Sequence, residues 1–352
     1  MNVRQLLPST PGRGNWEAAS GAELTYRELE QRANRLAHHL IGLGVGPEQL
    51  VGLALGLFLS AVTESLAQDV RVETQHQASA RNERVIEQET APEEVADPEL
   101  GDISLVSRAP RPKMFVFATL QSLNYSSNAF LVRDGAQGDY YWNGRVGASF
   151  VPYATRDFTP RLTFTQDWFR YDDFSQLDFD SQTLQLDLKY DLNHDDTWYV
   201  IGSYAVARLY SPDDSTGEFY RYGFLNASIT HLVQLKTAPL SLGFSGGSYW
   251  RHGDPSASDR ASAYLNVAAI YNLRETIQLS GFTRPEFQHY THDPLGSRDD
   301  FNLTVGAALT WTPNQYLALA ATASYIGNFS SVGVRRYDVV TPSLILAAQI
   351  AF

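Results

Sequence analysis

Residues 301–312 read FNLTVGAALTWT, and this stretch decides the fold class. Its odd positions carry apolar side chains such as Leu303, Val305 and Leu309, while small or polar residues occupy most even positions. Because successive side chains of a β-strand point to opposite faces, the alternation predicts a strand with one apolar and one polar face. The same period of two continues from Lys113 to Phe352, for example in TLQLDLKY at 183–190.

About twelve segments with this pattern follow one another, and many exceed the roughly 5–6 residues of a typical soluble strand. They cover residues 114–126, 139–153, 160–172, 180–192, 197–210, 218–235, 239–252, 258–272, 275–290, 299–312, 315–329 and 338–352. Strands this long cross a membrane at a tilt. A soluble sandwich gives the same alternation, so the segments alone do not exclude one.

The connections between the segments favour a barrel. Three are tight (236–239, 273–275 and 313–314), and they alternate with the longer polar loops 211–217, 252–258, 291–300 and 330–337. Short turns at one rim and long loops at the other are typical of transmembrane barrels. The fold expected for residues 113–352 is therefore all-β: a closed antiparallel transmembrane β-barrel of about twelve strands, preceded by a short helical or disordered region.

Aromatic residues gather near the segment ends, as in Tyr140-Tyr141-Trp142 and Tyr249-Trp250, where they would form the two girdles of a barrel in a membrane. The last strand ends in an alternating Gln-Ile-Ala-Phe at 349–352. With these features the chain resembles porin-like β-barrels of the Gram-negative outer membrane. The resemblance implies an outer-membrane location with both termini periplasmic, lipid as a partner, and an insertion machinery that reads Ile350 and Phe352.

Within each segment, the odd or even position of a residue decides whether it faces the apolar outside or the polar inside. This rule assigns a set of charged side chains to the inside of the barrel, and basic groups outnumber acidic ones among them. They are Arg145, Arg161, Asp167, Asp187, Lys189, Arg208, Arg251, Arg260, Arg284 and Glu286. A basic ring in a narrow pore attracts anions, so one hypothesis is a channel for small polar or anionic solutes. In the alternative, the charges pair across strands and fill a closed barrel that serves as an anchor or binds a surface partner. Twelve strands lie between the filled eight-stranded and the open sixteen-stranded barrels, so size does not decide.

The first quarter of the chain has a different character. Residues 24–54 read LTYRELEQRANRLAHHLIGLGVGPEQLVGLA, and apolar residues recur three or four apart in the pattern of an amphipathic helix. This wording resembles the N-terminal edge of nonribosomal peptide synthetase adenylation domains. The phosphate-binding loop and catalytic lysine of that family have no counterpart here, so an adenylating enzyme fragment is only a remote third alternative. We interpret residues 1–49 as a fusion or start-site artefact.

Two further zones precede the barrel. The apolar run LVGLALGLFLSAV at 50–62 and the small residues near Ala67 are typical of a signal peptide, which would occupy 50–67. Residues 68–112 are polar and acidic, with few aromatic residues, and predict a disordered periplasmic linker. Its acidic stretch at 83–99 suggests, by charge alone, a plug for a basic lumen.

Composition excludes several classes of function. The chain has no Cys, which excludes disulfides, thiolate metal sites and Cys nucleophiles, and its net charge of −12 argues against a nucleic-acid partner. His231 and Ser228 have opposite parity and cannot form a catalytic pair. His289, His292 and Asp293, like His194 with Asp195 and Asp196, could ligate a metal but stand at turns, where solvation explains them as well. The sequence therefore predicts no enzyme, metal or cofactor, and it leaves the oligomeric state open.

Overall fold

The computed structural model describes residues 16–17, 23–24, 113–193, 197–212, 217–235 and 238–352. Near the N-terminus, β1 (Trp16–Glu17) pairs with β2 (Glu23–Leu24) in a two-stranded sheet. The adenylation-like, signal-like and acidic segments predicted between 25 and 112 lie outside the described residues, as do the plug at 83–99 and the site at 194–196. These expectations stay predictions.

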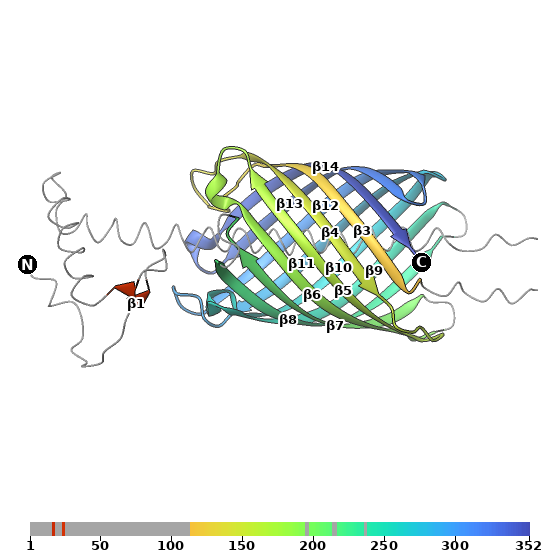
Figure 1. Cartoon of the computed structure of the whole chain (residues 1–352), viewed down its shortest axis with the longest axis horizontal. Helices are drawn as coiled ribbons and strands as arrows, with labels where there is room; N and C mark the ends of the chain where they lie inside the picture. The colour runs from red at the N-terminus through yellow and green to blue at the C-terminus, as the bar shows by residue number, and fades with distance from the viewer. Residues whose placement is uncertain (1–15, 18–22, 25–112, 194–196, 213–216, 236–237) are drawn as a thin grey trace, which may run out of the picture. The chain divides into compact units, whose positions relative to one another are not determined.

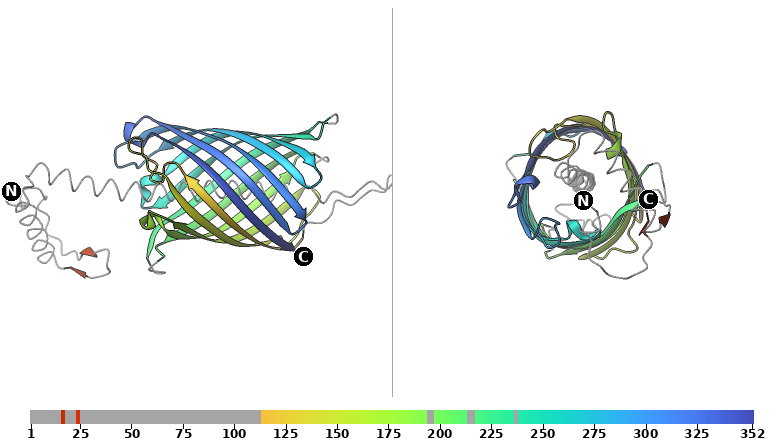
Figure 2. Two further views of the ribbon diagram at one scale, coloured as in Figure 1. Left: turned by 90° about the horizontal axis from the view of Figure 1, so that it is seen from above. Right: turned by 90° about the vertical axis from the view of Figure 1, so that its left-hand side faces the viewer.

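Twelve antiparallel strands close into one barrel, which confirms the predicted fold class (Figure 1). The strands are β3 (Phe115–Ser126), β4 (Asp139–Phe150), β5 (Phe158–Tyr171), β6 (Phe179–Asp191), β7 (Trp198–Tyr210), β8 (Glu218–Gln234), β9 (Leu240–Asp254), β10 (Arg260–Arg274), β11 (Ile277–Tyr290), β12 (Arg298–Asn314), β13 (Leu317–Ser330) and β14 (Tyr337–Ala351). Each strand pairs with its neighbours in sequence, and β14 pairs with β3 from Ser343 opposite Asn124 to Ala351 opposite Val116. No strand of this ring is left with an open edge, as the end-on view in Figure 2 shows.

The barrel has two distinct ends. At the terminal end, Phe115 and Phe352 exchange backbone hydrogen bonds, and the turns at 275–276 and 315–316 are tight. The loop end carries the connections 127–138, 172–178, 211–217, 255–259, 291–297 and 331–336, three of which contain a short 3-10 helix. The predicted alternation of short and long connections holds only in part, because 151–157 at the terminal end is as long as most loops opposite, and 192–197 is as long as the loop 331–336.

The outer surface is apolar on every strand of the barrel. Large side chains point outward and stay exposed, among them Leu123 (66%), Leu265 (62%) and Leu344 (64%). Exposed apolar area of this extent needs apolar surroundings. Among the described residues, no helix is long and apolar enough to cross a membrane.

Candidate functional site: the lumen of the barrel

Strand pairing decides which side chains face the lumen, because residues directly opposite each other on neighbouring strands share a face. Arg145 lies opposite Asp167, Asp187 opposite Ser203, and Arg260 opposite both Arg251 and Tyr290. These positions alternate with the exposed outer residues Leu184, Leu186, Val267 and their counterparts. All predicted lumen residues except one therefore face inward: Arg145, Arg161, Asp167, Asp187, Lys189, Arg251, Arg260, Arg284 and Glu286.

The exception is Arg208, which the sequence wrongly placed inside. It lies opposite Gln182 and Arg221 on the outer face, where its Nε is 3.7 Å from Glu218 Oε2. The error has a physical origin. At the loop end, the inner face of β7 is apolar, because Ala207 is buried and Leu209 packs into a buried aromatic cluster. Apolar side chains therefore mark both faces of this strand, and alternation does not reveal the lumen side.

The excess of basic groups is smaller than expected. Four further charged side chains face inward at strand ends: Asp139, Asp191, Arg298 and Asp300. Three of them are acidic, so the inward charges of the described strands are close to balanced. Arg298 was not predicted because residues 291–300 were expected to form a loop, whereas β12 begins at Arg298. Asp300 lies within the predicted segment 299–312, but at its overlap with that loop. Parity would have found these residues had the strand boundaries been known.

Most of these charges are paired. Arg145 Nε donates to Asp167 Oδ1 at 2.6 Å, and both side chains are almost fully buried. Lys189 Nζ lies 2.9 Å from Asp191 Oδ1. Asp187 accepts hydrogen bonds from Gln185 and Ser203. A buried charge needs such partners because desolvation is costly.

A basic and aromatic surface covers the inner face of β8 to β12 towards the loop end. We call it the arginine–tyrosine wall, and it comprises Tyr220, Tyr222, Tyr249, Arg251, Arg260, Tyr264, Arg284, Tyr290 and Arg298. The guanidinium carbon of Arg251 lies 3.8 Å from the ring centroid of Tyr222, and that of Arg298 lies 3.6 Å from Tyr290. Arg284 donates to Glu286 Oε2 at 2.8 Å, and Tyr249 donates to the other oxygen of Glu286. Positive charges and rings thus alternate along one side of the lumen.

On the other side of the loop end, the lumen holds an aromatic cluster. Phe169 and Phe179 are fully buried and stack with ring centroids 4.3 Å apart. Residues of two loop-end connections complete the cluster: Ala129 and Phe130 from 127–138, and Phe174 and Leu177 from 172–178. Both sides of the loop end are therefore filled by large side chains.

The terminal half of the lumen is lined differently. A cavity of about 80 Å³ opens there, next to the turn at 315–316. Small side chains line it, among them Ala118, Gly147, Ala318 and Ala347. Large side chains thus line the loop half of the lumen and small ones line part of the terminal half, except along β5 to β7, where Arg161, Lys189 and Asp191 lie.

The catalytic and metal candidates do not come together. His231 lies on the outer face near the terminal end, stacked on Trp198 with centroids 4.0 Å apart, while Ser228 faces the lumen. His289 is hydrogen-bonded to Asp299, and His292 lies 3.5 Å from Asp259. Asp293 instead contacts Arg298 and Arg335. Within the described part of the chain, no cluster of three or more His, Asp or Glu side chains could hold a metal ion.

The proposed assembly residues lie at the seam of the barrel. Ile350 and Phe352 point outward and are 58% and 61% exposed. The Phe352 ring packs against Phe117, with centroids 5.8 Å apart. Their role in insertion stays a prediction.

No family model matches the chain, and curated nonribosomal peptide synthetases match a small N-terminal part of it. Phosphinothricin tripeptide synthetase PhsC from Streptomyces viridochromogenes is 55% identical over 49 residues, which are 14% of this chain and 4% of that protein. A dimodular nonribosomal peptide synthase from Bacillus subtilis is 56% identical over 45 residues, 13% of this chain and 2% of the synthase. The chain thus spans only a few per cent of the length of these curated relatives. This short match is consistent with the adenylation-domain-like sequence at 24–54, and it gives no information about the barrel.

Solved structures similar to this chain are barrels. An outer membrane channel from Pseudomonas putida F1 has a TM-score of 0.48 and 14% identity, covering 68% of this chain and 96% of the channel. The NanC porin has a TM-score of 0.41 and 9% identity, covering 66% of this chain and all of the porin (100%). With TM-scores and identities this low, the likeness adds nothing to what the strands themselves show.

Proposed function

We propose that this protein is a Gram-negative outer-membrane channel through which small polar solutes diffuse, and that anions among them contact the arginine–tyrosine wall. The observation that carries the proposal is a closed ring of strands that is apolar outside and polar inside. A closed barrel is the one β-structure that leaves no backbone N–H or C=O unpaired in lipid. In this arrangement the terminal end faces the periplasm and the loop end faces the exterior.

The lumen supports passage of solutes in its terminal half, where small side chains leave space. The loop half supports selection, because charged and aromatic groups concentrate there. Charges in a narrow, low-dielectric passage act strongly on permeating ions. Diffusion through such a passage requires no cofactor and no chemical step.

A second candidate is a closed barrel that anchors a partner or binds a surface polymer. The burial of the loop half favours it: Arg251 and Arg260 line the inside of a tube but are only 1% and 2% exposed. Side chains that line a water-filled passage stay accessible to solvent, so this part of the lumen is filled.

Single-channel recording in planar bilayers distinguishes the two candidates. A channel shows discrete conductance steps, and Arg284→Gln lowers its anion-to-cation permeability ratio because one lumen charge is lost. The matched control is Arg208→Gln, which removes the same charge from the outer face and leaves the ratio unchanged. Absence of steps from correctly folded protein would exclude the channel and favour the closed barrel.

A further inference from the structure

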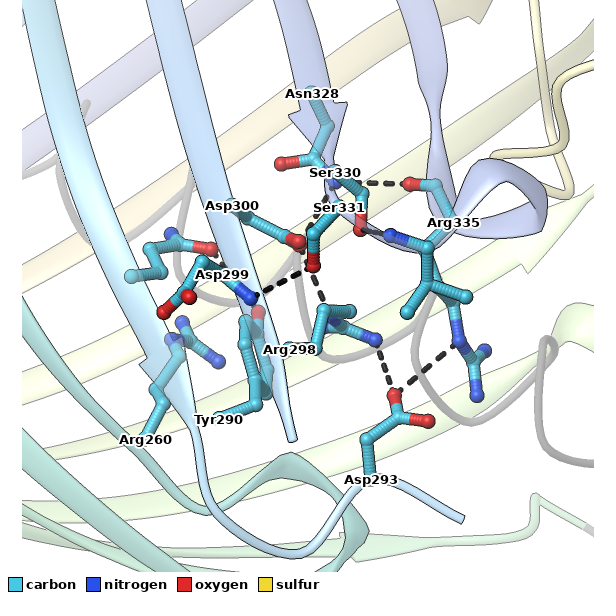
Figure 3. A network of polar contacts seen from close by, with 12 residues as sticks. Arg260, Tyr290, Asp293, Arg298, Asp299, Asp300, Asn328, Ser330, Ser331 and Arg335 are labelled. Atoms are coloured by element: carbon cyan, nitrogen blue, oxygen red, sulfur yellow. Dashed lines mark hydrogen bonds and ion pairs between the residues drawn. The ribbon is translucent and has the colours of Figure 1, made fainter. Parts of the chain in front are cut away.

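Two loops at the mouth of the barrel are joined by a buried network of charges (Figure 3). One loop, 291–297, connects β11 to β12, and the other, 331–336, connects β13 to β14 and contains the short helix η4 (Gly333–Arg335). Asp293 from the first loop accepts a hydrogen bond from Arg298 at the start of β12, and its Oδ2 lies 3.3 Å from Arg335 Nε of the second loop. We call Asp293, Arg298 and Arg335 the mouth triad.

The mouth triad is withdrawn from solvent. The side chain of Asp293 is 0% exposed, and those of Arg298 and Arg335 are 4% and 7% exposed. Burial lowers the pKa of the Arg335 guanidinium, and the Asp293 carboxylate opposes this shift. Arg298 has a second acidic neighbour, since its Nε lies 3.1 Å from Asp300 Oδ2. One carboxylate therefore stabilises two buried cations that belong to different parts of the mouth.

Further hydrogen bonds reinforce the same junction. The Asn328 side chain donates to Asp300 Oδ2 at 3.0 Å and to the Arg335 carbonyl at 2.9 Å. The backbone N–H of Asp299 donates to Ser331 Oγ at 3.0 Å, and that of Ser331 donates to the Asp299 carbonyl at 2.8 Å. The second loop is thus tied to the start of β12, the strand that follows the first loop, and the Asp293–Arg335 pair joins the two loops directly.

The triad is continuous with the arginine–tyrosine wall. Arg298 faces the lumen opposite Tyr290, and its guanidinium lies 3.6 Å from that ring. The charge of the triad therefore belongs to the lumen at its outer mouth. Removing the carboxylate leaves two arginines there. Arg298 keeps its contact with Asp300, whereas Arg335 loses the contact with Asp293 that opposes the effect of its burial.

We propose that Asp293 is a positioning residue of the channel mouth, which fastens the two loops to each other and sets the electrostatic character of the entrance by neutralising Arg298 and Arg335. The fastening is independent of transport, whereas the effect on permeating ions rests on the proposed function. Two measurements separate these parts.

The first measurement is loop mobility in the full chain. Because the chain has no cysteine, Val334→Cys, at a position that is 61% exposed, takes a single spin label on the second loop. Asp293→Asn, combined with this label site, is expected to increase label mobility severalfold, because the carboxylate that joins the loops is lost. The control is Asp299→Asn, which removes a 78% exposed carboxylate from the neighbouring outer face. Unchanged mobility in Asp293→Asn would overturn the fastening.

The second measurement is the reversal potential of single channels, with Arg335→Gln as the paired variant. Both variants loosen the loops, but Asp293→Asn makes the mouth more positive and Arg335→Gln makes it less positive. The anion-to-cation permeability ratio should therefore rise severalfold in the first and fall in the second. A purely structural role would move both ratios in the same direction, and this result, or no change in either, would overturn the electrostatic role.

The outcomes remain distinct if the channel itself fails. Increased mobility in a protein that never conducts would refute the proposed function and keep the fastening. If Asp293→Asn does not fold, Arg335→Gln decides alone: increased mobility together with a lower ratio supports the inference, and no change in both excludes it.

Discussion

The inner and outer faces of the barrel wall are built from the same twelve strands, yet they carry opposite chemistry. On β6, the outer residues Leu184, Leu186 and Leu188 are exposed to 41–45%, while the inner residues between them are polar. The difference shows that the surroundings of each face, and not the strand itself, determine how much stability a substitution costs. A charge buried inside must be paired, and a charge placed outside on the apolar band has no partner at all.

The largest expected difference between the faces concerns ion pairs. Asp167→Asn breaks the inner pair with Arg145, which is 2.6 Å long and almost fully buried. Removing one member of a buried ion pair costs about 3–5 kcal/mol. Urea unfolding in lipid vesicles, followed by tryptophan fluorescence, measures the loss.

The outer pair between Arg221 and Asp254 provides the control. It is 3.0 Å long, but its side chains are 58% and 70% exposed. Asp254→Asn is expected to cost only about 0–1 kcal/mol, because exposed ion pairs contribute little. Equal losses for the two variants would show that the lumen is solvated like the exterior loops.

The next difference concerns a new charge at mid-height of β13. Ala323 points outward and its neighbour Ser324 points inward, towards Gly306 and Thr341. Ala323→Arg places a cation in the apolar band and should cost about 2–4 kcal/mol in a bilayer. Ser324→Arg enters a polar lumen lined by small residues, so its cost should be a small fraction of that. If the two variants unfold alike in vesicles, the exterior does not lie in lipid.

The smallest difference concerns two glycines. A Cβ at Gly247, on the inner face, would lie 2.6 Å from the Ala227 carbonyl oxygen and 2.7 Å from the Tyr264 hydroxyl. Gly247→Ala therefore overpacks the lumen wall and should cost about 1–3 kcal/mol. Gly202→Ala on the outer face is the control, because nothing lies within 4 Å of the added atom. Equal stability of the two variants would contradict the close approach of Tyr264 to the backbone.

Alternation in the sequence determined the fold class, the number of strands and most of the lumen face. A strand between lipid and water must present apolar side chains at every second position. The sequence of 183–190 or 301–312 therefore already shows which residues belong to each face. The resemblance to outer-membrane barrels rested on the same regularity. Arg145, Asp167 and Arg260 could be placed inside from parity alone.

Only the tertiary structure decided what fills the lumen. Arg208 lies outside because Leu209 packs into an aromatic cluster whose members come from distant strands and two loops. Arg298 belongs to the lumen because β12 starts before the predicted segment 299–312, and Asp293 of one loop contacts Arg335 of another. The local alternation of residues indicates which face of a strand is apolar and which is polar. The contacts between side chains of different strands depend on strand register and on closure of the barrel, and the sequence of one segment does not determine these.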